Sequence, residues 1–84
     1  MNMTINPNNK DFRTADLALT AALCVSGFVV EELDKVSPQR SVFVFQNGEE
    51  LLDAVNQYWR RELRVEPQDY FNQLKIIKDR LYER

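Results

Sequence analysis

The most distinctive apolar segment of the chain runs from Val42 to Phe45, inside Ser41–Gln46. A strand with one solvent-exposed face alternates apolar and polar residues, whereas this run is apolar at successive positions. The pattern therefore predicts a central strand covered on both faces, with Val42 and Val44 on one side and Phe43 and Phe45 on the other. If only one face has cover, the uncovered pair is where a partner would bind, so Phe43 and Phe45 are candidate partner-binding residues.

A helix and a strand are predicted on the N-terminal side of the central strand, after a first core residue. Residues 15–26 are rich in Ala and Leu and form a helix that is apolar most of the way round, with Thr14 as N-cap and Gly27 closing it. Residues 28–36 form a strand, which a proline-containing turn joins to the central strand as an antiparallel hairpin. Phe12 is the first core residue, with or without a short strand of its own.

Two helices are predicted after the central strand. The first covers about residues 49–63, because apolar residues recur there at helical spacing and Asn47 precedes Glu50 by the three residues of a capping box. Pro67 ends that pattern and suits the first position of a second helix, over about residues 67–82. Because the link is short, the two helices are expected to pack as a helical hairpin. That pair would cover one face of the sheet, and the Ala/Leu helix the other.

Together these elements predict an α+β domain, in which a small antiparallel hairpin, with or without a short third strand, is packed with three helices. A chain of 84 residues is long enough for one such domain. Residues 1–10 are rich in Asn and are expected to form a flexible N-terminal arm, while residues 11–84 form the domain. Because so short a chain buries a modest core, we expect it to dock on a partner or on a second copy.

Several segments of the chain resemble a known family. They are Phe12–Leu17 with the apolar helix that follows as far as Phe28, then Arg40–Phe45, and last Tyr58 with Val65–Pro67 and Phe71–Lys75. Over about residues 11–82, the chain resembles a family of small single-domain proteins from bacteria, phages and metagenomic genomes, described as a domain of unknown function. The resemblance implies the domain boundary and an origin in phage or mobile genomes. It implies no activity, cofactor or catalytic residue.

Composition narrows the classes of function. Acidic residues outnumber basic ones by 13 to 11, which is unlike the basic surface of a general nucleic-acid binder. Cys24 is the one cysteine and there is no histidine, so no disulfide, zinc cluster or Cys–His catalytic pair can form within the chain. Cys24 is expected to be a small buried hydrophobe in a reducing, cytoplasmic setting. Neither a secretion signal nor a membrane-spanning segment is expected.

A group of basic residues is the first candidate site. Arg60, Arg61 and Arg64 lie close together in the sequence, and Lys75 and Lys78 extend the group if the last helix folds back beside them. Such a patch is typical of proteins that contact the phosphates of DNA or RNA. The alternative is that these cations complement the dipole at a helix C-terminus and keep the surface soluble. The acidity of the whole chain favours the alternative.

The acidic residues Glu49, Glu50 and Asp53 are the second candidate. Glu49 and Asp53 are four residues apart and share one helical face, where they could bind a metal ion or share a proton. Acidic residues are equally expected in the first turn of a helix, because they complement its dipole. No third ligand, nucleophile or base accompanies them at a recognisable spacing, so we expect no metal, no cofactor and no catalysis.

Four aromatic residues, Tyr58, Trp59, Tyr70 and Tyr82, are the third candidate group. Aromatic residues can be interface anchors or platforms on which bases stack. Tyr58 and Trp59 continue the apolar stripe of their helix, and we expect them in the core. Tyr82 lies near the end of the chain, where it is the best placed of the four to bind a partner.

The sequence therefore leads to two hypotheses of function. The first is a small non-catalytic protein-interaction module, such as an adaptor or inhibitor encoded by a phage or mobile element. It would bind a protein partner or form a homo-oligomer, and it would have no membrane partner. The second is an accessory protein that binds nucleic acid through the basic group.

Overall fold

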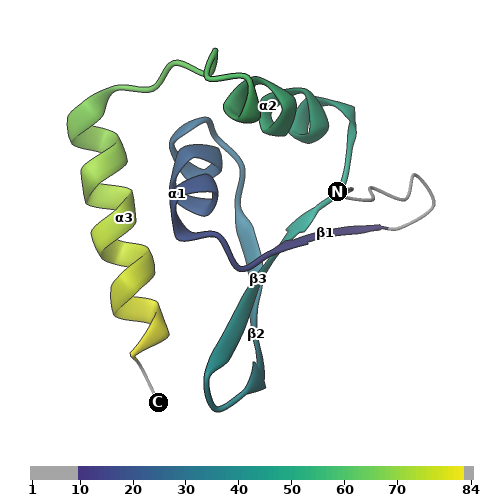
Figure 1. Ribbon diagram of the computed structural model, residues 1–84, viewed down its shortest axis with the longest axis vertical. Coiled ribbons are helices and arrows are strands. Elements are labelled where there is room, and N and C mark those ends of the chain that lie inside the picture. The colour runs from purple at the N-terminus through teal and green to yellow at the C-terminus, as the bar shows by residue number, and fades with distance from the viewer. Residues whose placement is uncertain (1–9, 83–84) are drawn as a thin grey trace.

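The structure is a computed structural model that describes residues 10–82, and Figure 1 shows the arrangement of its elements. In chain order they are β1 (Asp11–Thr14), α1 (Leu17–Val25), β2 (Val30–Ser37), β3 (Arg40–Gln46), α2 (Glu49–Trp59) and α3 (Pro67–Leu81). The predicted α+β class is confirmed. The predicted N-terminal arm, apart from Lys10, lies outside the described residues.

The sheet has three antiparallel strands in the order β1-β3-β2. The predicted central strand is confirmed, and the short third strand around Phe12 is present. Phe12 lies opposite Phe45, and their ring centroids are 6.5 Å apart. On the other side of β3, Leu33 of β2 lies opposite Phe43. These rows of apolar side chains form one face of the sheet.

All three helices pack their apolar residues against this phenylalanine face. Phe43 and Phe45 are each 1% exposed, and they share one core cluster with Leu23 of α1, Leu51 of α2 and Ile77 of α3. We therefore find a sheet with helices on one side, and the predicted cover of the opposite face by α2 and α3 is wrong. Neither pair of β3 side chains is exposed, because all four residues are buried.

The opposite face of β3 is covered in a different way. Val42 and Val44 are buried there but lie outside the core cluster. Arg13 of β1 lies opposite Val44, and Asp34 of β2 lies opposite Val42. Arg13 and Asp34 form an ion pair with an N–O distance of 2.5 Å, so their side chains cross β3 above the two valines. The hydrogen bond to Asp34 raises the pKa of Arg13.

The predicted helical hairpin is wrong. Within the described part of the chain, α2 and α3 each pack on α1 and not along each other, and Figure 1 shows α1 between them. The reason is that α2 ends at Trp59, four residues before its predicted end, and residues 60–66 then run as irregular chain. This connection is long enough to carry α3 to the far side of α1.

The helix termini confirm part of the predicted capping. Pro67 is in the first turn of α3, as predicted. The N-cap of α1 is Asp16 and not Thr14, since the Asp16 carboxylate accepts a hydrogen bond of 3.1 Å from the backbone N of Leu19. The predicted capping box at Asn47 is wrong, because the N-cap of α2 is Gly48 and no side chain caps it.

Candidate recognition groove

The end of helix α2 sets the geometry of the candidate site. The backbone N of Arg61 donates to the Tyr58 carbonyl at 3.0 Å, and the backbone N of Glu62 donates to the Gln57 carbonyl at 2.8 Å. These two bonds define a Schellman motif, which requires a left-handed residue just after the helix. That residue is Arg61, with a φ of 65°. The turn sends the chain away from the α2 axis and exposes the last residues of the helix.

A groove of about 490 Å³ lies beside this turn. We call it the aromatic groove. Its lining comes from α1, α2, the connection and α3, and consists of Ala22, Tyr58, Trp59, Arg61, Leu63, Val65 and Tyr70. Leu63 and Val65 are two residues apart, so an extended chain presents both to the same side. Six of the seven lining residues are apolar or aromatic, and Arg61 is the charged one.

Two aromatic residues of α2 form one wall of the groove. The rings of Tyr58 and Trp59 pack edge to face, with centroids 5.0 Å apart. Trp59 is 58% exposed, so its predicted place in the core is wrong. It is the last residue of α2. Tyr58 is half-buried, and burial, with contributions from Asp16 and Tyr70, raises the pKa of its phenol. The hydroxyl therefore stays protonated at neutral pH.

The predicted basic group separates into two parts. Arg60, Arg61 and Arg64 are exposed around the connection, and Arg61 alone of the three lines the groove. Lys75 and Lys78 lie further along α3. Within residues 10–82, none of these five cations is in an ion pair. All five side chains are exposed.

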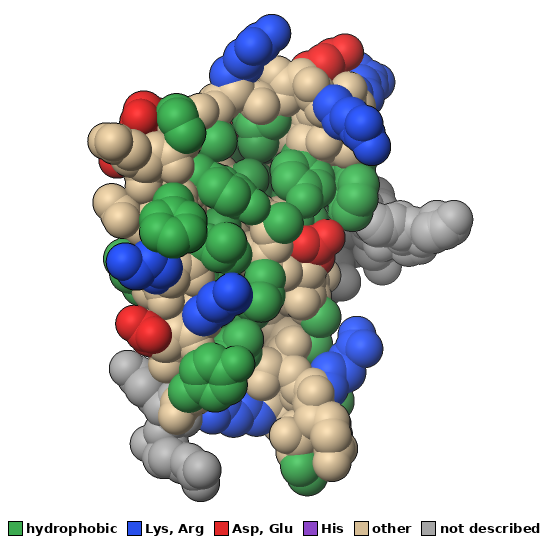
Figure 2. All heavy atoms as spheres, turned by 60° about the vertical axis from the view of Figure 1, so that its left-hand side comes forward, with side chains coloured by type: hydrophobic (Ala, Val, Ile, Leu, Met, Phe, Trp, Pro, Cys, Tyr) green, Lys and Arg blue, Asp and Glu red, His purple; other side chains and the backbone are tan. Residues whose placement is uncertain are grey.

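The two lysines share the outer face of α3 with aromatic residues. Phe71, Lys75, Lys78 and Tyr82 follow one another at spacings of four, three and four residues, which places them on one face of a helix. All four are exposed, and the Lys75 ammonium lies 5.4 Å from the centroid of the Phe71 ring. Figure 2 shows hydrophobic side chains gathered on this side of the molecule, with Lys and Arg side chains among and around them. Tyr82 is exposed, so its side chain is accessible to a partner.

The other predicted partner-binding residues are not at the surface. We expected Phe43 or Phe45 to contact a partner on condition that one face of the strand lacked cover. That condition is not met, since both rings are inside the core cluster.

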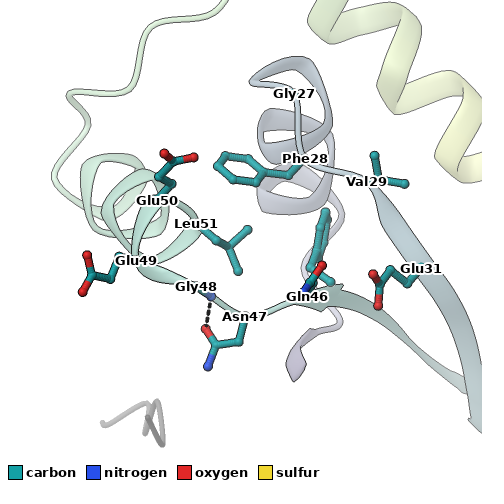
Figure 3. Close-up of a pocket in the computed structure, with 11 residues that line it drawn as sticks. Gly27, Phe28, Val29, Glu31, Gln46, Asn47, Gly48, Glu49, Glu50 and Leu51 are labelled. Carbon is teal, nitrogen blue, oxygen red and sulfur yellow. Dashed lines mark hydrogen bonds between the residues drawn. The ribbon is translucent and has the colours of Figure 1, made fainter. Parts of the chain in front are cut away.

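The acidic candidates lie at the opposite end of α2. Glu49 and Glu50 line a hollow of about 510 Å³, together with Glu31 of β2 and residues 45–48. Figure 3 shows the three carboxylates spread around this hollow rather than converging on one point. Within residues 10–82, no group of three or more His, Cys, Asp or Glu side chains could hold a metal ion.

Cys24 lies half-buried on α1, against the core. Burial raises the pKa of its thiol, and the positive charge of Arg80 offsets part of that effect. The thiol is therefore protonated at neutral pH and is a poor nucleophile.

Sequence reasoning missed the groove itself. It placed Leu63 on a continuing helical stripe, and it gave Val65 no role. A signal was present, because two apolar residues at a spacing of two, just before a proline, are typical of extended chain.

Comparison with other proteins identifies a family. No similarity was found to a curated protein or to a solved structure. Within residues 10–82, no helix has the length and apolarity needed to cross a membrane. Residues 9–83 match a domain of unknown function, DUF5659. This match covers nearly the whole chain, and the chain therefore belongs to the DUF5659 family.

Proposed function

We propose that the chain is a non-catalytic protein-recognition module that binds its partner in the aromatic groove. The observation that carries the proposal is the exposure of Trp59 beside a concave apolar surface. Trp and Tyr are frequent anchors of protein interfaces, because each buries a large apolar area and keeps a polar atom for a hydrogen bond. The volume of the groove is within the range of pockets that enclose a small ligand or several side chains.

Charge supports a partner of a particular chemistry. Residues 57–82, which supply most of the groove, contain six Lys or Arg and four Asp or Glu, whereas residues 10–56 contain four and eight. Most of the groove lining therefore comes from the part of the described chain with a net positive charge. An acidic partner segment would be attracted to it and oriented by it. We infer that the partner presents a short amphipathic segment, with apolar anchors for the groove and carboxylates for its rim. The module would then act as an adaptor or inhibitor of the protein that it binds.

The single tryptophan of the chain offers a direct test. Peptides would be selected on the immobilised protein from a random library that lacks tryptophan, and the enriched sequences titrated against it while Trp59 fluorescence is recorded. Saturable binding is expected to change the emission, since a peptide in the groove would alter the solvent exposure of the indole. The enriched peptides are expected to combine apolar residues with Asp or Glu.

Matched variants locate the binding site. Leu63→Ala and Tyr70→Ala change the groove lining and are expected to weaken binding by about tenfold each. Ile76→Ala is the control, because Ile76 is an exposed apolar residue of α3 that does not line the groove. Failure to enrich any peptide, or equal binding by the groove variants and the wild type, would argue against the proposal.

A second candidate function is binding of single-stranded nucleic acid, favoured by the outer face of α3. There, Phe71 and Tyr82 flank Lys75 and Lys78, and aromatic rings beside cations are a common surface for bases and phosphates. Labelled oligothymidine and oligouridine would be titrated at about 50 mM and about 200 mM salt. The Lys75→Ala/Lys78→Ala variant should bind more weakly than wild type, and so should Arg60→Ala/Arg61→Ala/Arg64→Ala. Binding that does not depend on salt, or that both variants retain, would count against this function.

A further inference from the structure

Arg61 occupies a position that the fold itself does not favour for an arginine. In the left-handed conformation the Cβ atom of any L-residue is crowded by its own backbone, so this position of a Schellman motif is usually glycine. Among residues 10–82, Arg61 is the one non-glycine residue with a positive φ. The end of α1 has the same motif and uses Gly27, with a φ of 105°. The chain therefore has a glycine at one helix end and lacks it at the other.

Contacts within the described residues do not explain the arginine. Its side chain is exposed, and within residues 10–82 it forms no ion pair and no hydrogen bond. Its position does give it one distinguishing property, because the left-handed turn places Arg61 on the wall of the groove, while Arg60 and Arg64 lie outside it. The guanidinium is thus the one charged group among the residues that line the groove.

We propose, on the basis of the proposed function, that Arg61 is the residue that selects the partner by binding a side-chain carboxylate of the segment in the groove. A guanidinium matches a carboxylate through two parallel hydrogen bonds, and such bonds are stronger beside apolar surface than in open water. The apolar anchor of the partner lies between Trp59 and Tyr70, and its aspartate or glutamate lies next to that anchor. Arg61 therefore distinguishes acidic amphipathic segments from neutral ones.

Substitution of Arg61 by glycine gives two readouts of opposite sign. Arg61→Gly is expected to raise the melting temperature of the free protein by about 4 °C, because it relieves the left-handed strain. It is also expected to weaken binding of an enriched acidic peptide by about tenfold. An effect confined to folding would change only the first readout. Arg64→Ala is the matched control, since it removes an exposed cation that does not line the groove.

A double-mutant cycle with the peptide completes the test. Changing the critical Glu or Asp of the peptide to Gln or Asn should weaken binding to wild type by the same factor, and should leave its binding to Arg61→Gly unchanged. Arg61→Lys keeps the charge but loses the two-pronged geometry, and an intermediate affinity is expected.

The outcomes separate this inference from the proposed function. If Leu63→Ala weakens binding while Arg61→Gly does not, the groove binds the peptide and the assignment of Arg61 is overturned. If Leu63→Ala has no effect, the proposed function itself fails. If Arg61→Gly weakens only oligonucleotide binding, the assignment to a carboxylate is overturned in favour of a phosphate.

Discussion

Helices α1 and α2 end in the same backbone motif, but the side chains around the two ends differ. At the end of α1, Gly27 donates to the Cys24 carbonyl at 3.1 Å and Phe28 donates to the Leu23 carbonyl at 3.0 Å. Leu23 is in the core, and Phe28 packs against it. Apolar residues at these two positions fit the hydrophobic contact that frequently accompanies the motif.

The end of α2 has the hydrogen bonds without that contact. The residues equivalent to Leu23 and Phe28 are Gln57 and Glu62, and both are exposed. Glycine is replaced by Arg61. One end therefore stabilises the fold, while the other leaves a strained arginine and an exposed tryptophan at the surface. Departures from local preference of this kind are expected where a surface has a function besides folding.

The largest expected contrast is between the equivalent residues Leu23 and Gln57. Leu23→Ala should lower the free energy of unfolding by about 3 kcal/mol, because it leaves a cavity in the core. Gln57→Ala should change it by less than about 0.5 kcal/mol, as at other exposed positions. Urea denaturation of both variants measures the difference. Equal losses would show that the two helix ends contribute alike to stability.

Glycine at the end of α1 should matter for its backbone conformation alone. Gly27→Ala is expected to cost about 1 kcal/mol, since a Cβ would have open space around it but φ is 105°. Gly48 is the control, because its surroundings are also open while its φ of 176° is extended. Gly48→Ala should stay within about 0.5 kcal/mol of wild type. A similar loss in both variants would mean that φ is not the cause.

The same reasoning predicts that replacing the left-handed Arg61 at the end of α2 stabilises the protein. Replacing Arg61 with Asn and then Gly should raise the free energy of unfolding stepwise, to about 0.5–1 kcal/mol above wild type for glycine, because Asn tolerates the left-handed region better than Arg. Urea denaturation of the series measures this. A loss of stability in Arg61→Gly would show that the arginine side chain supports the fold after all.

This contrast also explains what the sequence could predict. The glycine at position 27 indicates the end of α1. Apolar spacing predicts the strands and the central position of β3, and Pro67 predicts the start of α3. The residue type of Arg61 does not indicate a left-handed turn, so the sequence predicts that α2 continues to residue 63. A helix that continues to residue 63 would leave no turn at Arg61, so the sequence predicts neither the groove nor the exposure of Trp59.

The sequence also does not show which elements pack against each other. Apolar spacing shows which face of a helix is buried, but it does not show against which element. The stripes of α2 and α3 fit each other as well as they fit α1, and the short link favoured the hairpin. The ion pair of Arg13 and Asp34 across β3 depends on strand register, which single residues do not reveal.

The smallest expected effect is a pH dependence at another pair of equivalent positions. Cys24 and Tyr58 supply the carbonyls that accept from Gly27 and Arg61, and burial raises the pKa of both side chains. A raised pKa means that the folded state holds the proton more tightly than the unfolded state. Stability is therefore unaffected at neutral pH and falls as pH rises above the unfolded value, about 8.5 for Cys and about 10 for Tyr.

Two substitutions separate the contributions of the two helix ends. Cys24→Ala should flatten the decline in urea-measured stability that begins above about pH 8.5, and Tyr58→Phe the part that begins above about pH 10. If Cys24→Ala leaves the first part of the decline unchanged, the thiol is no more buried in the folded chain than in the unfolded one. The end of α1 would then be looser than its hydrogen bonds and core contacts imply, and the contrast with α2 would rest on Gly27 and Leu23 alone.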